Sequence, residues 1–301
     1  GSSILSDVES LPRSMLMWRS FSHWVGGMGV LVFIIAFLPL SGGNNMHLMK
    51  AESTGPSVNK IVPRVKKTAI ILYTIYFSFT IVEFILLLFG GLDAFEAINI
   101  AFATAGTGGF AIHNNSLGDY SSYLQIVITV FMLLFSINFG SYFLLFTGKI
   151  KESFNCEVRC FLLIFITAVS CISINIYNMY GNLGEAIRNS AFTVSSIIST
   201  TGFSTVDFDK WPEFSQTIVV LVMFTGSCAG STAGGIKISR ILILIKGISK
   251  ELLSMIHPNQ IKKITSDKKT IEHETVRSVN VYIVCYLLIF TASIIIVSFE
   301  D

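Results

Sequence analysis

Six stretches of this 301-residue chain are apolar over about the 20 residues that an α-helix needs to cross a bilayer. In lipid, every backbone N–H and C=O group must be bonded within the protein, and a continuous apolar stretch achieves this as a helix. We therefore expect an all-α polytopic membrane protein. The six stretches are Met15–Leu40, Thr68–Phe89, Tyr123–Phe146, Cys160–Tyr180, Ile218–Ile245 and Val279–Val297.

The composition agrees with this expectation and excludes other classes. Hydrophobic residues make up 52% of the chain and charged residues only 13%, whereas about a quarter of the residues in soluble domains are charged. The formal net charge of +2 gives no reason to expect a nucleic-acid partner. The cysteines and histidines form no CxxC, HExxH or Cys/His cluster, so we expect no enzyme, no metal centre and no covalent cofactor.

A T-x-G-F motif occurs twice, as Thr107-Gly108-Gly109-Phe110 and as Thr200-Thr201-Gly202-Phe203. Each motif follows an apolar stretch too short to cross a bilayer comfortably, Ala94–Ala103 or Leu183–Ile198, and each short stretch contains the tripeptide Glu-Ala-Ile. Repetition at a fixed place in each unit indicates a structural repeat. We interpret the unit as a long helix, a short pore helix, a filter loop and a second long helix.

The motifs suit a filter for a monovalent cation. Glycine lets the backbone bend, and carbonyl groups at membrane depth replace the water shell of an alkali cation. Neither motif contains Asp or Glu, so oxygen atoms of carbonyl and hydroxyl groups would coordinate the ion, which favours a monovalent cation over Ca²⁺. The candidate potassium ligands are the carbonyl groups of Thr107, Gly108, Thr200 and Thr201. The alternative for a single motif is an ordinary turn that ends a helix.

The charges of the connecting segments predict the orientation. The connectors between spans are basic, whereas the segments with the two T-x-G-F motifs are mostly acidic, which places the connectors in the cytoplasm and the filter mouths outside. The acidic mouth would concentrate cations, although loop carboxylates are also commonly there for solvation. The basic residues are Lys50, Lys60, Arg64, Lys66, Lys67, Lys149, Lys151, Arg159, Lys246, Lys250, Lys262, Lys263, Lys268, Lys269 and Arg277; the acidic ones are Asp93, Asp119, Asp207, Asp209 and Glu213.

The span Ile218–Ile245 is interrupted by the glycines Gly226, Gly230, Gly234 and Gly235. Glycine weakens a helix by up to about 1 kcal/mol, and irregular backbone at membrane depth needs protein or water around it. We expect a flexible gate loop, Gly226–Gly235, beneath the filter. Close helix packing by small residues is the alternative. A phosphate-binding loop is excluded, because Ile236 intervenes before Lys237. Lys237 either reaches the membrane interface or opposes a permeating cation.

Three other polar residues lie within the expected spans. Glu83 is expected to be paired, neutral or directed into an internal cavity, with a proton relay as an alternative role. Asn138 and Ser141 are expected to bond neighbouring helices, or alternatively to line a cavity.

These motifs together resemble the membrane subunit of bacterial Trk potassium uptake systems, within the Trk/Ktr/HKT superfamily. The resemblance covers essentially the whole chain, and the gate loop is its most specific part. The residues that carry it are Trp24–Val30 with Leu38-Pro39, the two T-x-G-F motifs, and Gly226–Lys237.

The resemblance implies a potassium pore in the bacterial inner (plasma) membrane, built from four repeats around a pseudo-fourfold axis. It also implies a homodimer and a cytoplasmic nucleotide-binding regulatory subunit; the basic connectors would meet that subunit or membrane lipids. The filter glycines would be Gly1, Gly109 and Gly202. The chain would be a fragment that lacks both ends. Its parts would be 1–40 (end of repeat 1), 68–147 (repeat 2), 160–245 (repeat 3), 246–277 (cytoplasmic connector) and 278–301 (start of repeat 4).

A different class, a secondary sodium-coupled solute transporter, also uses broken helices. Its expected signature is a pair of interruptions in corresponding spans, whereas this sequence shows an evident interruption in only one full span. The sequence therefore favours potassium translocation over solute symport.

Overall fold

The computed structural model describes residues 5, 7–29, 65–257, 264–267 and 269–299. The regular secondary structure of these residues is helical apart from one hairpin, in which β1 (Thr265–Ser266) pairs antiparallel with β2 (Lys269–Thr270). The chain divides into two compact units, residues 1–238 and 239–301. The all-α class expected from the apolar stretches is thus the observed one.

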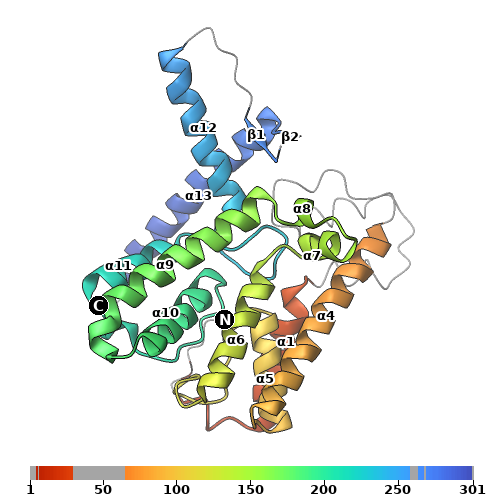
Figure 1. Cartoon of the computed structure of the whole chain (residues 1–301), viewed down its shortest axis with the longest axis vertical. Helices are drawn as coiled ribbons and strands as arrows, with labels where there is room; N and C mark the ends of the chain where they lie inside the picture. Colours follow the sequence, from red (N-terminus) through yellow and green to blue (C-terminus); the bar gives the residue numbers. More distant parts are fainter. Residues whose placement is uncertain (1–4, 6, 30–64, 258–263, 268, 300–301) are drawn as a thin grey trace. The chain divides into compact units, whose positions relative to one another are not determined.

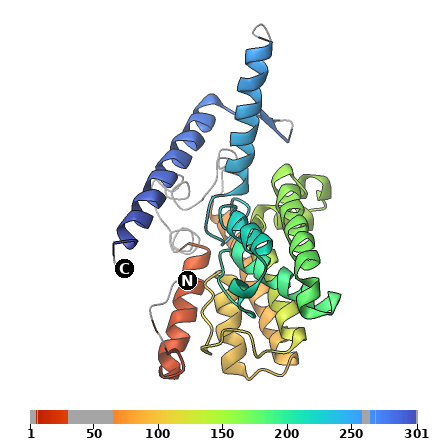
Figure 2. The same cartoon turned by 90° about the vertical axis from the view of Figure 1, so that its left-hand side faces the viewer.

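The first unit begins with α1 (Arg13–Gly27), which covers the described part of the expected Met15–Leu40 span. The long helix α4 (Val65–Phe89) follows, and the chain then reverses at Gly90-Gly91. Asp93 starts α5 (Ala94–Ala105) by accepting a hydrogen bond from the Glu96 N–H at 2.9 Å. At 1.5 Å per residue, α5 is about 18 Å long, too short to cross a bilayer. Figures 1 and 2 show α4 and α5 side by side in orange and gold.

The next repeat has the same order of helices. A connector with the short helix α8 (Ile150–Ser153) leads to α9 (Cys156–Tyr180), which the Asn155 side chain caps and which ends at Gly181. The side chain of Asn182 then caps α10 (Leu183–Ile198), and α10 packs back along α9 (Figure 1). A 3₁₀ turn (Phe208–Lys210) and α11 (Glu213–Met223) complete this part. Helices therefore occupy both short stretches that the sequence predicts as pore helices.

The expected span Tyr123–Phe146 is not one helix, and this prediction is wrong. It forms α6 (Ser122–Ser136) and α7 (Phe139–Phe146), which meet at an angle of 92°. Ile137 is extended, and the Asn138 side chain starts α7 by accepting a hydrogen bond from the Gly140 N–H at 2.7 Å. The polar and small residues from Ser136 to Ser141 were the sequence signal for this break.

The expected span Ile218–Ile245 consists of α11 and α12 (Ile238–Ile256), with non-helical residues 224–237 between them. The second unit contains most of α12, the hairpin and α13 (His273–Val297). Inside this unit, the guanidinium of Arg240 lies 3.7 Å from the ring centroid of Tyr282. Among the described residues, Ala69–Phe89, α9 and α13 are long and apolar enough to cross a membrane, and the bent pair α6–α7 is a fourth candidate.

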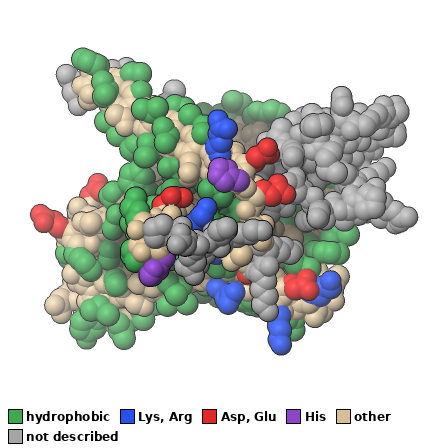
Figure 3. Space-filling view, turned by 90° about the horizontal axis from the view of Figure 1, so that it is seen from above, with side chains coloured by type: hydrophobic (Ala, Val, Ile, Leu, Met, Phe, Trp, Pro, Cys, Tyr) green, Lys and Arg blue, Asp and Glu red, His purple; other side chains and the backbone are tan. Residues whose placement is uncertain are grey.

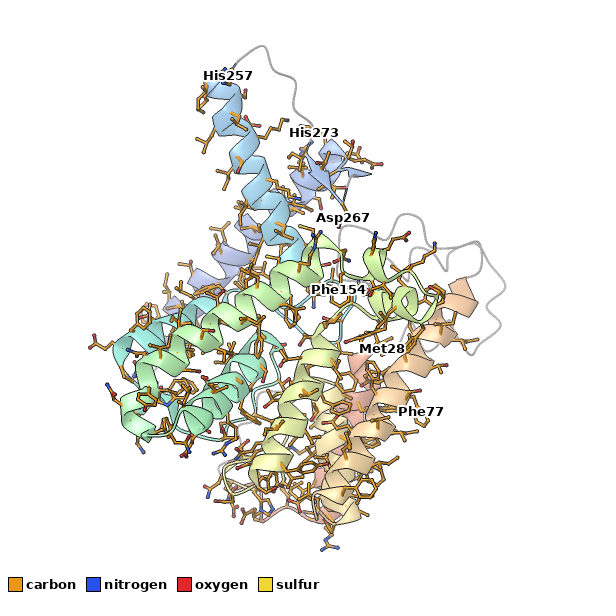
Figure 4. The ribbon with its side chains drawn as sticks, viewed as in Figure 1. Met28, Phe77, Phe154, His257, Asp267 and His273 are labelled. Atoms are coloured by element: carbon orange, nitrogen blue, oxygen red, sulfur yellow. The ribbon has the colours of Figure 1, made fainter. Side chains whose placement is uncertain are left out.

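Aromatic side chains fill the core between α4 and the α6–α7 pair. The Phe79 ring meets the Tyr142 ring edge-on at 4.9 Å, and Tyr76 and Phe135 meet in the same way at 5.7 Å. The outward faces of the helices are also apolar: Phe77 is 54% exposed and points away from the helices in Figure 4. Hydrophobic side chains likewise cover much of the face in Figure 3. A chain apolar both inside and outside is typical of a membrane protein.

We predict that Asn138→Ala lowers the free energy of unfolding by about 1 kcal/mol, because the first turn of α7 loses its cap. Asn138→Ser keeps a capping oxygen and is the matched control. Thermal unfolding of the full-length protein in detergent measures the difference. Equal melting temperatures for the alanine variant and the parent would contradict the capping role.

Candidate ion filter and gate

The two T-x-G-F motifs have the same backbone conformation. We name Thr107–Phe110 turn A, which follows α5, and Thr200–Phe203 turn B, which follows α10. The threonine that opens each turn has a positive φ, 53° in turn A and 56° in turn B, and so has the glycine two residues later, at 68° and 89°. A positive φ is uncommon for threonine. The repeat in the sequence is therefore also a repeat in the backbone.

The first two amide groups of each turn are bonded to the preceding helix in the same way. In turn A, Thr107 N donates to Thr104 O and Gly108 N to Ala103 O; turn B repeats this pattern at the same sequence offsets. Among the residues that the structure describes, no hydrogen-bond donor occupies the carbonyl oxygens of Gly108, Thr200 and Thr201. Carbonyl oxygens that accept no hydrogen bond, next to amides that are already bonded to a helix, suit a site for a cation.

Turns A and B lie against each other. A Cβ atom added to Gly109 would be 2.1 Å from the carbonyl oxygen of Thr201, so only glycine fits at this contact. The loops that follow the turns are also joined, because Leu117 N donates to Ser204 O at 3.0 Å. Asn114 in the same loop accepts from Val8 N at 2.8 Å. The segment after turn A is thus hydrogen-bonded both to the segment around Val8 and to the segment after turn B. Gly1 itself lies outside the described residues.

A cavity of about 650 Å³ lies next to the two turns. Turn A, turn B and the gate loop all contribute to its wall. Helix α1 also contributes, which the sequence analysis did not predict, although the Gly26-Gly27 pair marks the place: a Cβ on Gly27 would be 2.8 Å from Gly106 Cα. The lining residues are Ser22, His23, Gly26, Gly27, Gly106, Thr107, Phe110, Thr200, Thr232 and Gly234.

The phenylalanines of the two motifs lie in different surroundings. Phe203 is 3% exposed and belongs to the hydrophobic core. Phe110 lines the cavity, with the Arg19 guanidinium 4.7 Å from its ring centroid and the His23 ring edge-on at 5.4 Å. The shared letter F in the motif therefore corresponds to two different packing roles.

The gate loop is bonded directly to the filter threonines. Thr200 Oγ1 accepts a hydrogen bond from Gly234 N at 2.7 Å. The hydroxyl group of Thr107 has two acceptors, Gly106 O at 2.7 Å and Thr232 O of the gate loop at 3.1 Å. The sequence predicts carbonyl oxygens of these threonines as ligands and leaves hydroxyl oxygens open as further ligands. In the structure the two hydroxyl groups link each turn to the loop.

The gate loop also bonds to the break between α6 and α7. Cys228 N donates to Ser136 O at 3.1 Å, and Phe139 N donates to Gly230 O at 3.0 Å. Asn138, expected to bond a neighbouring helix, instead caps α7 and packs against Gly230: a Cβ there would be 3.2 Å from Asn138 Oδ1. Each interruption thus supplies the partners for backbone groups that the other leaves open.

The expected spans Tyr123–Phe146 and Ile218–Ile245 are therefore both interrupted. The sequence analysis assumed an interruption in the second of them alone, and this assumption was wrong. This premise was used against the solute transporter. The two breaks bond to each other, however, rather than leaving their backbone groups open toward a substrate.

Lys237 is directed into the protein rather than toward its surface. Its side chain is 1% exposed, and Nζ donates to the carbonyl oxygens of Ala233 and, at 3.4 Å, Gly234. The last turn of the gate loop therefore holds an ammonium group on carbonyl oxygens next to the cavity. Gly226 closes the other end of the loop, where its N–H donates to Ile236 O at 2.6 Å, and Gly235 has a φ of 72°.

Glu83 is fully buried in α4, and neither carboxyl oxygen has a hydrogen-bond partner among the described residues. A paired carboxylate, one of the arrangements expected from the sequence, is thus not provided by this part of the chain. Several acidic residues of the expected mouth have local roles: Asp93 caps α5, and Asp207 caps the 3₁₀ turn and pairs with Lys210 at 3.3 Å.

Comparison with known proteins identifies the family. The model of the TrkH family, described as cation transport protein, matches residues 1–300. The Trk system potassium uptake protein TrkH of Escherichia coli K12 is 34% identical over 98% of this chain and 62% of its own length. TrkG of the same strain is 33% identical over 99% of this chain and 62% of its own length.

A solved structure agrees with these sequence matches. The crystal structure of the potassium transporter TrkH from Vibrio parahaemolyticus superposes with a TM-score of 0.82 at 29% identity, over 97% of this chain and 61% of that one. This chain thus spans about three fifths of the length of these relatives. Because the family model matches residues 1–300, the chain belongs to the TrkH family of cation transport proteins.

Proposed function

We propose that the protein to which this chain belongs takes up potassium ions across the membrane through a filter that includes turns A and B. The observation that carries this proposal is the pair of similar turns in contact beside a cavity. The first two amides of each turn are bonded to the preceding helix, and the carbonyl oxygens of Gly108, Thr200 and Thr201 accept no hydrogen bond from the described residues. The relatives from Escherichia coli are named as potassium uptake proteins.

In this proposal the carbonyl groups of Thr107, Gly108, Thr200 and Thr201 are ligands of the transported potassium ion. They replace the water shell that the ion loses in the filter. The C-terminal ends of α5 and α10 carry the negative ends of the helix dipoles, and both lie directly before the turns, where they stabilise a cation. Gly1 would contribute to a third turn of the same kind, and a fourth repeat would come from residues beyond this chain.

The gate loop would close the pathway below the filter. Its residues Thr232 and Gly234 line the cavity together with the filter threonines. The Nζ of Lys237 lies on loop carbonyl oxygens, where it repels an entering cation and takes up oxygen ligands that the cation would otherwise use. Hydrogen bonds from the loop to both turns and to the α6–α7 break hold it in place.

The orientation and partners of this protein are part of the same proposal. Basic residues gather in the connectors, so these would face the cytoplasm of a bacterial inner membrane, with the filter mouths outside. The resemblance to Trk membrane subunits supports a homodimer with four repeats per chain around a pseudo-fourfold axis. It also supports a cytoplasmic nucleotide-binding regulatory subunit.

The test of this function is ion flux through the full-length protein in liposomes. We expect the flux of potassium to exceed that of sodium, because the filter offers carbonyl oxygens without carboxylate groups. The second candidate, a sodium-coupled solute transporter, is favoured by the two broken spans alone. Solute accumulation driven by a sodium gradient, with no independent potassium flux, would support that candidate and exclude ours.

We predict that replacing Gly109 or Gly202 by serine reduces the preference of the protein for potassium over sodium. The sequence alone suggests that a side chain at Gly202 would be crowded, but nothing lies within 4 Å of a Cβ there. The cost at Gly202 therefore comes from its φ of 89°, about 1–2 kcal/mol for an L-residue. At Gly109 the clash with Thr201 O adds to the same strain.

The permeability ratio of potassium to sodium should therefore fall by about tenfold in Gly202→Ser, and further in Gly109→Ser. Gly181→Ser, another positive-φ glycine far from the turns in the chain and with open space around it, is the matched control. Unchanged ratios in both filter variants, from correctly inserted protein, would contradict the filter.

We also predict that removing the charge of Lys237 raises potassium flux in the absence of any regulatory partner. Lys237→Met keeps most of the side-chain volume, whereas Lys237→Ala also opens a cavity, so the methionine variant should be the more stable of the two. Shortening the gate loop should act in the same direction. Lys151→Met, at an exposed lysine, is the control for loss of charge. Flux no greater than that of the parent in all Lys237 and loop variants would leave the gate without support.

A further inference from the structure

Glu157, in the first turn of α9, contacts the middle of the gate loop. Its Oε1 accepts a hydrogen bond from Ala229 N at 2.6 Å, although the two residues are 72 positions apart. Ala229 is 4% exposed. A hydrogen bond from an amide N–H to a carboxylate is shorter than one to a neutral acceptor and roughly twice as strong.

The neighbours of Ala229 are held by a different element. Cys228 donates to Ser136 O, and Gly230 accepts from Phe139 N, both at the α6–α7 break. Three consecutive loop residues are therefore fastened on two sides, by the break and by α9. A loop bonded in this way cannot leave the cavity unless the bond to Glu157 also breaks.

The connector between α7 and α9, residues 147–155, ends directly before α9, two positions before Glu157. Ser153 Oγ donates to Ser141 O at 2.8 Å, and the Asn155 side chain caps α9 by accepting from Val158 N at 2.9 Å. Phe154, labelled in Figure 4, is 48% exposed on this connector. A shift of the exposed connector would therefore move the first turn of α9 and, with it, the carboxylate that holds the loop.

We propose that Glu157 is a positioning residue that latches the gate loop to the start of α9 and keeps the loop in its closed position. This inference rests on the proposed ion pathway for its effect on flux. Its effect on the loop itself is independent of which ion, if any, passes.

An acidic residue in the first turn of a helix also stabilises that helix through the helix dipole, and this is the purely structural role to be distinguished. The latch and the dipole differ in what they do to the loop. Loss of the latch frees the segment around Cys228, whose side chain is fully buried. Loss of a dipole contact weakens α9 without changing access to Cys228.

The experiment measures two quantities on the full-length protein in liposomes, with the other cysteines replaced by serine. One is the rate at which N-ethylmaleimide modifies Cys228, and the other is potassium flux. Glu157→Ala removes the acceptor, whereas Glu157→Gln keeps an acceptor oxygen without the charge. Glu152→Ala is the matched control, because Glu152 is an exposed acid on the same connector whose partner is Lys149, at 3.9 Å.

We expect modification of Cys228 and potassium flux each to rise about tenfold in Glu157→Ala, as loss of a hydrogen bond to a charged group implies. A smaller rise is expected in Glu157→Gln, and none in Glu152→Ala. Selectivity for potassium over sodium should stay unchanged.

An unchanged rate of Cys228 modification in correctly inserted Glu157→Ala would overturn the latch, as would an equal rise in Glu152→Ala. If the alanine variant fails to insert, Glu157→Gln decides: a rise of about threefold or more supports the latch, and a smaller one overturns it. Absence of potassium flux in the parent protein would contradict the proposed function. The rate of Cys228 modification would still decide the latch.

Discussion

The structure depends on how two interrupted helices satisfy their backbone groups away from water. A helix that breaks in lipid leaves N–H and C=O groups open, each at a cost of several kcal/mol. Here Ser136 O and Phe139 N, at the α6–α7 break, are bonded to Cys228 and Gly230 of the gate loop. Neither interruption is therefore stable without the other. This mutual bonding holds the loop beside the cavity.

The filter turns and the gate loop form one bonded unit. Thr107 and Thr200 occupy equivalent places in turns A and B, and each uses its hydroxyl group to bond the loop, at Thr232 and Gly234. A hydroxyl group engaged in this way cannot move freely to a cation, which leaves the carbonyl oxygens as the main candidate ligands. It also means that movement of the loop changes the support of both turns. In the proposed function, conduction and selectivity would therefore depend on the same hydrogen bonds.

Broken helices by themselves do not separate an ion pathway from a solute transporter, because both use them. The two classes differ in what the backbone groups at the helix breaks and the buried charged side chains bond to. The amides of Phe139 at the α6–α7 break and of Gly226 and Cys228 in the gate loop are bonded within the protein, and the ammonium group of Lys237 rests on loop carbonyl oxygens. Such a loop occupies space beside the filter turns, as a barrier does. Membership of the TrkH family points in the same direction.

The sequence by itself determined the features that depend on neighbouring residues. Apolar length distinguishes the long helices α4 and α9 from the short helices α5 and α10, and the T-x-G-F repeat locates the two turns. The tertiary structure decided the α6–α7 break, the role of the threonine hydroxyl groups and the contact of Glu157 with Ala229. Each depends on hydrogen-bond partners that lie 34 to 125 positions away. Local patterns set which segments become helices, but only the folded chain brings distant donors and acceptors together.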